Sequence, residues 1–277
     1  MRSMRAVFKA AGLILSQQLS VQLGYRMAFV QVALFEAIGL VGTLFYWRAA
    51  ATSGSGSGYS AAGIVVYFIV ASSHQILQES GISRSLSMDI RTGKLAASLV
   101  RPFPFLLQPV CQGVAYSLSR LLMIGPVLVA IFLCVPALRD FFVDVAREQG
   151  AMIWLSGYFA ALSLALICNL VVRLSLGLLA FDMTQTWGPE LLFMSIFFAL
   201  SGVVYPVDLL PVPAVQALSW TPFFYMQGLP NLVALGRVSD GALTAYLARG
   251  CLVTVIATFI LVFMWRRGVR KFEAIGI

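Results

Sequence analysis

Residues 82–102 read ISRSLSMDIRTGKLAASLVRP, and this stretch carries much of the charge of an otherwise apolar chain. Ile82, Leu86 and Ile90 recur every four residues, so they share one stripe of a short helix. Gly93 interrupts the pattern, as glycine commonly does at the C-terminus of a helix. The first half of the stretch is therefore predicted to be a short amphipathic helix.

A second short helix is predicted to begin at Lys94, to carry Leu95 and Leu99 on one face, and to stop before Pro102. Four basic residues decorate the whole stretch, namely Arg84, Arg91, Lys94 and Arg101. A basic, two-part amphipathic segment between apolar spans predicts a helix lying at the cytoplasmic membrane surface. The residues leave two roles open: a solvated loop that only fixes topology, or a docking element for a cytoplasmic partner.

Composition places the chain in a membrane. Of its 277 residues 60% are hydrophobic and only 11% are charged, whereas soluble domains carry about 25% charged residues. The pattern indicates a single domain of packed helices that cross the bilayer several times. The net charge of +8 is concentrated between apolar segments, so it predicts contact with inner-leaflet lipid and not with nucleic acid.

The predicted fold is an all-α integral membrane protein with six transmembrane helices. Residues 1–24 are basic and apolar but interrupted by glutamines, which predicts an amphipathic helix lying in the interface. The transmembrane domain then occupies residues 25–277. Its six spans are expected at about 27–47, 61–77, 112–135, 153–172, 191–204 and 251–265.

The segments between the spans carry their own signals. Residues 138–150 predict a short external helix with mixed charge, and the third span is expected to enter through an interfacial turn before Gln112. Residues 201–226 are apolar but contain four prolines, too many for one helix. A re-entrant hairpin before the last helix is the interpretation this favours, because buried irregular backbone needs protein or water around it. An external loop with aromatic anchors is the alternative.

Charge bias orients the chain. Thirteen Lys and Arg fall on the side that holds both termini, and five fall on the other side. The excess predicts that both termini are cytoplasmic.

Familiar catalytic and nucleotide-binding patterns are missing from the sequence. There is no GxxxxGK[ST], no GxSxG and no HExxH, and His74 is the only histidine. The four cysteines form no CxxC pair. The chain itself is therefore expected to be neither an ATPase nor another enzyme, and to hold no cofactor or metal.

Glu36 is the costliest residue in the sequence, because an ionised side chain at the centre of a span costs about 3 kcal/mol on insertion scales. A contact with Arg120, Arg173 or a hydroxyl on another helix would offset this cost. A role in a substrate path or in proton coupling is the other interpretation, with Gly39 one turn further along the same span.

Three motifs resemble those of permease subunits of ABC-2-type exporters, in the branch of uncharacterised ABC-2 family permeases. IRTGKLAASLVRP (90–102) is similar to the cytoplasmic loop of that branch, and SGVVYPVDLLP (201–211) to its hairpin before the last span. GVRKFEAIG (268–276) is similar to its C-terminal motif, with Phe272 where tyrosine is usual. The resemblance covers the architecture of the whole chain.

The resemblance implies a function and a set of residues. The loop between spans two and three would be the coupling helix, which sits in a cleft of a separate ATPase subunit that binds ATP and magnesium. Its contact and geometry residues would be Asp89, Arg91, Gly93, Lys94, Leu95 and Arg101. Pro206, Asp208 and Pro211 would shape the re-entrant hairpin.

The assembly that the resemblance implies has two ATPase copies and a second permease, identical or homologous, in a bacterial inner membrane. Substrate would pass between the permeases, which would bring Glu36 and Gly39 near the path.

Two other classes of function stay open at the level of sequence. One is a secondary transporter driven by protons through Glu36, although only one broken helical region is found where such transporters carry a pair. The other is a membrane-embedded enzyme, which the shortage of polar groups within the spans disfavours.

Overall fold

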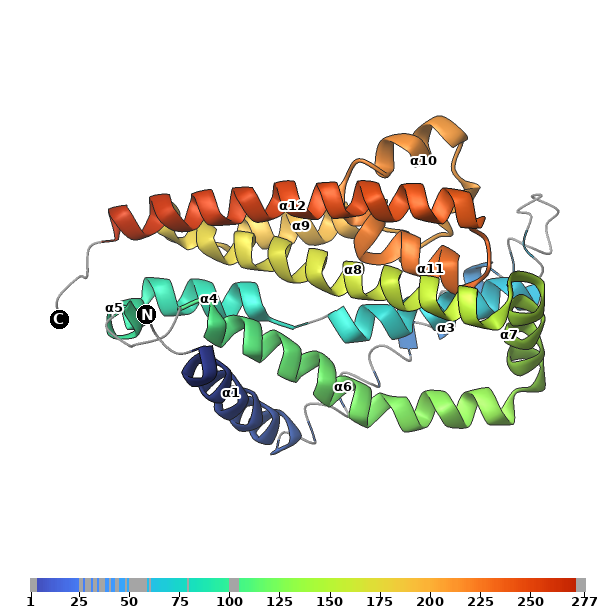
Figure 1. Cartoon of the computed structure of the whole chain (residues 1–277), viewed down its shortest axis with the longest axis horizontal. Helices are drawn as coiled ribbons and strands as arrows, with labels where there is room; N and C mark the ends of the chain where they lie inside the picture. The colour runs from blue at the N-terminus through green and yellow to red at the C-terminus, as the bar shows by residue number, and fades with distance from the viewer. Residues whose placement is uncertain are drawn as a thin grey trace.

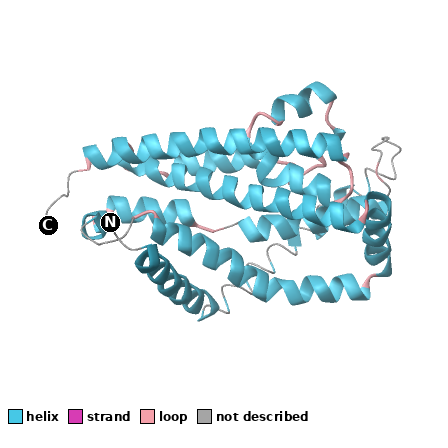
Figure 2. Ribbon diagram, in the orientation of Figure 1, coloured by secondary structure: helices cyan, strands magenta, loops and turns pink. Residues whose placement is uncertain are grey.

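The computed structural model describes residues 4–24, 59, 61–78, 80–99 and 105–272, together with scattered positions between 27 and 49. Within these residues every regular element is helical (Figure 2). Most of the predicted first span, including Glu36, lies outside the described residues, as do Arg101 and the last part of the C-terminal motif.

The main helices of the bundle run along the major axis of the molecule (Figure 1). They are α3 (Ala61–Gln78), α6 (Leu107–Cys134), α8 (Ala151–Leu178) and α12 (Asp240–Lys271). The short helices α4 (Ile82–Arg91) and α5 (Lys94–Leu99) lie at one end with the C-terminal end of α12, and α7 (Pro136–Gln149) crosses the other end. The predicted inner and outer connections are thus separated at opposite ends of the bundle.

Hydropathy and length single out two helical segments of the described chain that could cross a bilayer. These are Ala151–Phe181 and Asp240–Lys271, and α9 (Trp187–Leu200) is apolar but shorter. The predicted count of six spans remains a prediction.

Several predicted boundaries need correction. The turn before the third span lies at residues 105–106, and α6 is continuous from Leu107 through Gln112. Pro109 is accepted because it falls in the first turn, where the proline nitrogen needs no hydrogen-bond partner. The last helix begins at Asp240 and not near residue 251, and α9 ends at Leu200 where residue 204 was expected. For α12 hydropathy marks only the apolar middle of the helix, whereas its more polar first turns continue the hydrogen-bonded ladder. Helix α9 instead ends before the predicted span does, ahead of Gly202, whose φ is 85°.

The proline-rich segment between α9 and α12 is broken, as predicted, but it is longer than expected. It contains a 3₁₀ turn η2 (Val207–Leu209), the helix α10 (Val212–Leu218), a π-helical turn η3 (Phe224–Gly228) and α11 (Leu229–Ala234). In the outgoing arm, residues 201–223, the exposed residues are concentrated around α10, whereas the returning arm, Phe224–Leu235, is buried throughout. The returning arm is therefore part of the core.

Three apolar clusters fill the bundle. One joins α8, α9 and α12 to the returning arm, and a second joins α3 and α7 to α11. The third lies at the opposite end and joins α4 and α5 to α8 and α12. The short helices at that end thus share a core with the long ones.

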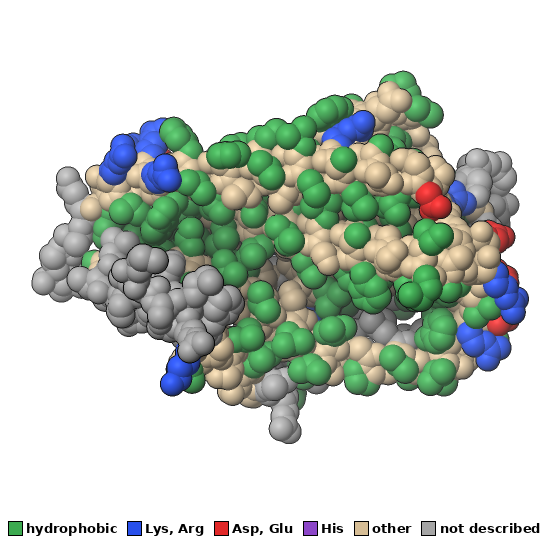
Figure 3. All heavy atoms as spheres, viewed as in Figure 1, with side chains coloured by type: hydrophobic (Ala, Val, Ile, Leu, Met, Phe, Trp, Pro, Cys, Tyr) green, Lys and Arg blue, Asp and Glu red, His purple; other side chains and the backbone are tan. Residues whose placement is uncertain are grey.

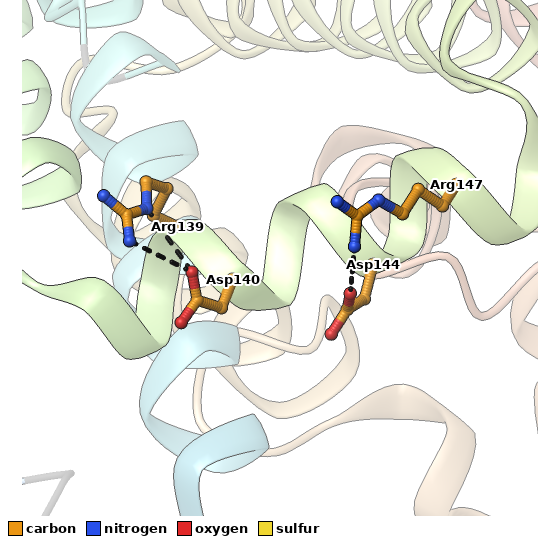
Figure 4. Close-up of polar contacts among 4 residues, drawn as sticks. All are labelled: Arg139, Asp140, Asp144 and Arg147. Carbon is orange, nitrogen blue, oxygen red and sulfur yellow. Dashed lines mark hydrogen bonds and ion pairs between the residues drawn. The ribbon is translucent and has the colours of Figure 1, made fainter.

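Helix α7 shows why a mixed-charge segment can close one end of the bundle. Leu138 and Val145 are buried, while the pairs Arg139–Asp140 (3.3 Å) and Asp144–Arg147 (3.6 Å) lie on the exposed side (Figure 4). Gly150, with φ of 78°, ends α7 and allows the sharp turn into α8. The predicted external helix is confirmed as a helix.

The predicted N-terminal helix is also present, as α1 (Met4–Gly24). It packs beside α6, where the Cys111 thiol lies 3.8 Å from the Ala11 carbonyl oxygen. Its location in the membrane interface remains a prediction.

Candidate functional site

The basic stretch folds as its sequence pattern predicts, but its apolar face has a different neighbour. Ile82, Leu86 and Ile90 are buried, at 1%, 1% and 4% exposure. They pack into the cluster that contains Leu174 and Leu178 of α8. The apolar stripe thus packs on protein, where the prediction had expected lipid, and the location of α4 at the membrane surface remains a prediction.

Two glycines set the ends of α4. Gly81 and Gly93 have φ of 59° and 74°, in the left-handed region that side chains with a Cβ rarely adopt. Gly93 N–H donates to the Ile90 carbonyl and Thr92 Oγ1 to the Met88 carbonyl, which closes the last turn. Leu95 is fully buried directly after this turn. Gly93 and Leu95 thus fix the angle between the two short helices.

The close approach of α4 to α8 depends on Gly177. A Cβ at this position would lie 3.0 Å from both Leu86 Cβ and the Ser83 carbonyl oxygen. The α4 backbone can therefore sit against α8 only while residue 177 has no side chain.

The opposite face of α4, together with the start of α5, carries charge and is exposed. Arg84, Arg91 and Lys94 are exposed, and Met88 is half exposed between them. Asp89 is partly buried, and burial raises the pKa of its carboxyl while nearby Lys94 lowers it. This charged surface, formed by residues 84–94, is the candidate coupling surface.

The coupling surface is tied to the start of α9. Thr186 Oγ1 donates to Ser87 Oγ at 3.2 Å, and Arg84 Nε lies 3.9 Å from Glu190 Oε2. The side chain of Arg84 is 81% exposed, so this pair adds little to stability. A displacement of α4 would nevertheless be felt by α8 and α9 together.

The end of α12 lies beside the same surface. Asp182 follows α8 and accepts a hydrogen bond from Lys271 Nζ at 2.9 Å, with Arg267 at 3.8 Å. Gly268 packs against the ring of Phe181. The described part of the C-terminal motif therefore anchors the last helix to the end of α8.

This anchor predicts a pH dependence. The hydrogen bond from Lys271 and the charges of Lys271 and Arg267 hold the pKa of Asp182 below its ordinary value of 3.8. Because the pKa is lower in the folded chain, the contact stabilises the fold fully above the unfolded pKa and is lost as pH falls through the folded one.

Thermal unfolding of wild type and Asp182→Asn, followed from about pH 6 to about pH 3, checks this expectation. The two melting temperatures should converge at the acid end. A constant difference across the range would contradict it.

Asp208 of the predicted hairpin lies at the opposite end of the bundle. It accepts a hydrogen bond from the Tyr59 hydroxyl at 2.8 Å and pairs with Arg237 at 2.6 Å. The Arg237 guanidinium also lies 3.6 Å over the Tyr59 ring. Burial, followed by the Asp208 charge, raises the pKa of Tyr59, so its hydroxyl stays a donor. Asp208 thus holds η2 to the chain before α3 and to the loop after α11.

Replacing Asp208 by alanine is expected to lower the free energy of unfolding by about 1 kcal/mol, because a half-buried pair and a hydrogen bond are lost together. Asp144→Ala is the matched control, since its pair with Arg147 is 3.6 Å long with side chains 67% and 77% exposed. Thermal unfolding in detergent measures both. Equal shifts in the two variants would count against an anchoring role for Asp208.

Pro206 and Pro211 flank η2, and both have extended backbone. Tyr67 of α3 donates from its hydroxyl to the Gly202 carbonyl at 2.6 Å, just before Pro206. Together with Asp208 these contacts fix the outgoing arm of the hairpin.

A buried polar network joins the hairpin to α3 and α8, and the sequence pattern did not reveal it. His74 Nδ1 lies 2.6 Å from Asn231 Oδ1 and Nε2 lies 2.8 Å from the Tyr158 hydroxyl. Since the amide oxygen can only accept, Nδ1–H donates to it and Nε2 accepts from Tyr158. Isolated polar residues in apolar helices are the signal that could have pointed to this network.

The network continues toward the coupling surface. Gln227 donates to the Ala71 carbonyl at 2.6 Å, and Gln78 donates to the Met226 carbonyl. Asn169 donates to the carbonyl of Gln78, which is the last residue of α3. The π-helical turn at Phe224–Gly228 is thereby locked to the end of α3 that precedes α4.

Arg173, one of the cations that the sequence offered as a partner for Glu36, is buried in α8. Its Nε donates to Asn169 Oδ1 at 3.3 Å, and its guanidinium lies 5.6 Å from the centre of the Phe193 ring. Gly39 is a helical residue on an exposed face, where a Cβ would meet nothing within 4 Å. No cluster of three or more His, Cys, Asp or Glu able to hold a metal occurs among the described residues.

Comparison with known proteins identifies the family. No curated protein matches the chain. A family model described as "ABC-2 family transporter protein" matches residues 37–276, which include α4, α5, the hairpin and the C-terminal motif. The chain therefore belongs to the ABC-2 transporter family, whose members are membrane permeases of ABC transporters.

Proposed function

We propose that this chain is the membrane subunit of an ATP-driven exporter, and that residues 84–94 form its docking surface for a separate ATPase. The main support is that α4 has two different faces. Its apolar stripe is anchored in the core against α8, whereas Arg84 and Arg91 on its other face, and Lys94 at the start of α5, are exposed. A docking element must combine these two properties, since it has to bind a partner and pass its motion on.

The docking surface divides the roles of its residues. Arg91 and Lys94 supply exposed positive charge for the partner, and Asp89 supplies a partly buried acid beside them. Gly93 and Leu95 hold the geometry of the turn. Arg101 belongs to the same group by resemblance alone.

Contacts inside the bundle supply a route from the ATPase to the far end. Movement of α4 would act on α8 at Gly177, and α8 is joined to the end of α3 by the hydrogen bond from Asn169 to the Gln78 carbonyl. Gln78 donates to the Met226 carbonyl in the π-helical turn of the hairpin. In the η2 turn of the same hairpin, Asp208 pairs with Arg237 at the far end of the bundle. ATP-driven closure of the partner would thus reach the hairpin through α3 and α8 without any nucleotide site in this chain.

The assembly in this proposal has two ATPase copies and two permeases, identical or homologous, in a bacterial inner membrane with both termini cytoplasmic. The placement of α4, α5 and the end of α12 at one end of the bundle supports this orientation.

Purification of the chain from its native membrane in mild detergent, with mass spectrometry of what accompanies it, tests the proposal. An ABC ATPase in equal stoichiometry would support it, and a second permease sequence would indicate a heterodimer. Transport by the chain without any ATPase, collapsing with the proton gradient, would overturn it in favour of proton coupling through Glu36.

A further inference from the structure

Two adjoining cavities lie between α3, α6 and α8 and open to the outside of the bundle. Their volumes are about 510 and 500 Å³, and they share Ser73, His74, Tyr158 and Phe159 as lining residues. The first reaches toward α7 at Phe142, and the second reaches the α3–α4 junction at Ser80. Figure 3 shows an opening between α6 and α8 beside α7, bordered by hydrophobic side chains. We call the two cavities together the lateral groove.

The groove has the length and polarity of a hydrocarbon site. Its lining on α8 runs from Trp154 to Leu170, which is ~24 Å at ~1.5 Å per residue. This exceeds the ~15 Å of hydrocarbon in one leaflet of a bilayer. No charged side chain is among the described residues that line either cavity.

The rim shows which way the groove faces. Leu121 and Val114 of α6 and Phe159 of α8 border it and are 50%, 47% and 58% exposed. In a membrane permease, exposed apolar side chains on long apolar helices face the acyl chains of the bilayer. The groove therefore opens toward lipid, where water cannot fill it.

One end of the groove carries polar atoms without partners. Gln78 and Ser80 are 3% and 6% exposed, and Gln78 Oε1 and Ser80 Oγ have no hydrogen-bond partner among the described residues. Both residues line the second cavity. The amide of Gln78 is oriented by its donation to the Met226 carbonyl, so Oε1 is left as an acceptor. A buried unpaired acceptor of this kind is costly unless a ligand donates to it.

We propose that the lateral groove binds one hydrocarbon chain of an uncharged, hydroxyl-bearing bilayer lipid, whose hydroxyl hydrogen-bonds with the unpaired oxygen atoms of Gln78 and Ser80. The apolar lining accepts the chain, and the described lining residues offer no charge to pair with an ionic headgroup. This site is separate from the docking surface and does not depend on ATP-driven transport.

Photolabelling of the full chain in phosphatidylcholine vesicles tests the site. The probes are a monoacylglycerol with a diazirine in its acyl chain and the methyl ester of the same fatty acid, which lacks the hydroxyls. Mass spectrometry should find labelled peptides of α3, α6 and α8, with about fivefold more label from the monoacylglycerol, as one added hydrogen bond predicts. Equal labelling by the two probes would overturn the hydroxyl site.

A matched pair of variants tests the groove. Leu121→Trp fills it, whereas Leu122→Trp adds the same side chain at the next position of α6, which is 56% exposed and does not line either cavity. Labelling by both probes should fall several-fold in the first variant and stay at the wild-type level in the second. Ser80→Ala should reduce the preference for the monoacylglycerol. Equal labelling of the two tryptophan variants would rule the groove out, and the wild-type probe comparison stands even if a variant fails to fold.

Discussion

Arg91→Glu is expected to reduce co-purification of the ATPase more than tenfold while the melting temperature of the chain stays unchanged. Arg91 is exposed at the end of α4, so its reversal should cost the isolated fold less than about 0.5 kcal/mol. At an interface the reversed charge meets a surface selected for the opposite sign, which costs several kcal/mol. Lys94→Glu should act in the same direction. Pull-down and ATP-dependent transport measure the effect.

Arg139→Glu on α7 is the matched control for this experiment. It reverses an exposed arginine at the opposite end of the bundle, where the side chain is 52% exposed beside Asp140. ATPase binding should be retained in this variant. If Arg91→Glu and Arg139→Glu retained the ATPase equally well, residues 84–94 would not be the docking surface.

Gly177→Val is expected to separate ATP hydrolysis from transport and to lower transport more than tenfold. The new side chain would press on the α4 backbone at Ser83 and on Leu86, each 3.0 Å from the Cβ position. Overpacking of this kind typically costs 1–3 kcal/mol and displaces the element that is struck. The charged face of α4 is untouched, so the ATPase should still bind.

Gly188→Val on α9 is the control, since a Cβ there meets nothing within 4 Å. Transport and ATPase rates of the reconstituted complex, together with pull-down, distinguish the outcomes. Normal transport by Gly177→Val would show that the tight packing of α4 on α8 is not needed for coupling.

Sequence periodicity predicted the two short helices of residues 82–99 because their signals are local. A four-residue apolar repeat, a glycine and a proline determine where two short helices begin and end. What packs against the apolar stripe, by contrast, depends on residues distant in the sequence. Protein and lipid are equally apolar neighbours for Ile82 and Leu86, so no pattern within residues 82–102 could decide between them.

The burial of the returning arm of the hairpin was not predicted, for a related reason. Residues 223–235 contain Pro230 and polar Gln227 and Asn231, which lower hydropathy and favour a loop interpretation. In the fold these amides are buried and bonded to α3 through Ala71 and His74. A polar residue in a membrane helix is stable only where it has a hydrogen-bond partner. A partner that is distant in the sequence cannot be identified from the sequence pattern alone.

The burial of α4 against α8 has a consequence for biogenesis. Residues 82–91 are synthesised well before residues 151–178, which provide the surface that covers their apolar stripe. Until α8 enters the membrane, that stripe has no protein partner on α8. An amphipathic basic helix in this situation adsorbs to the inner leaflet. The membrane-surface helix that the sequence predicts would then be an assembly intermediate, released from lipid when α8 arrives.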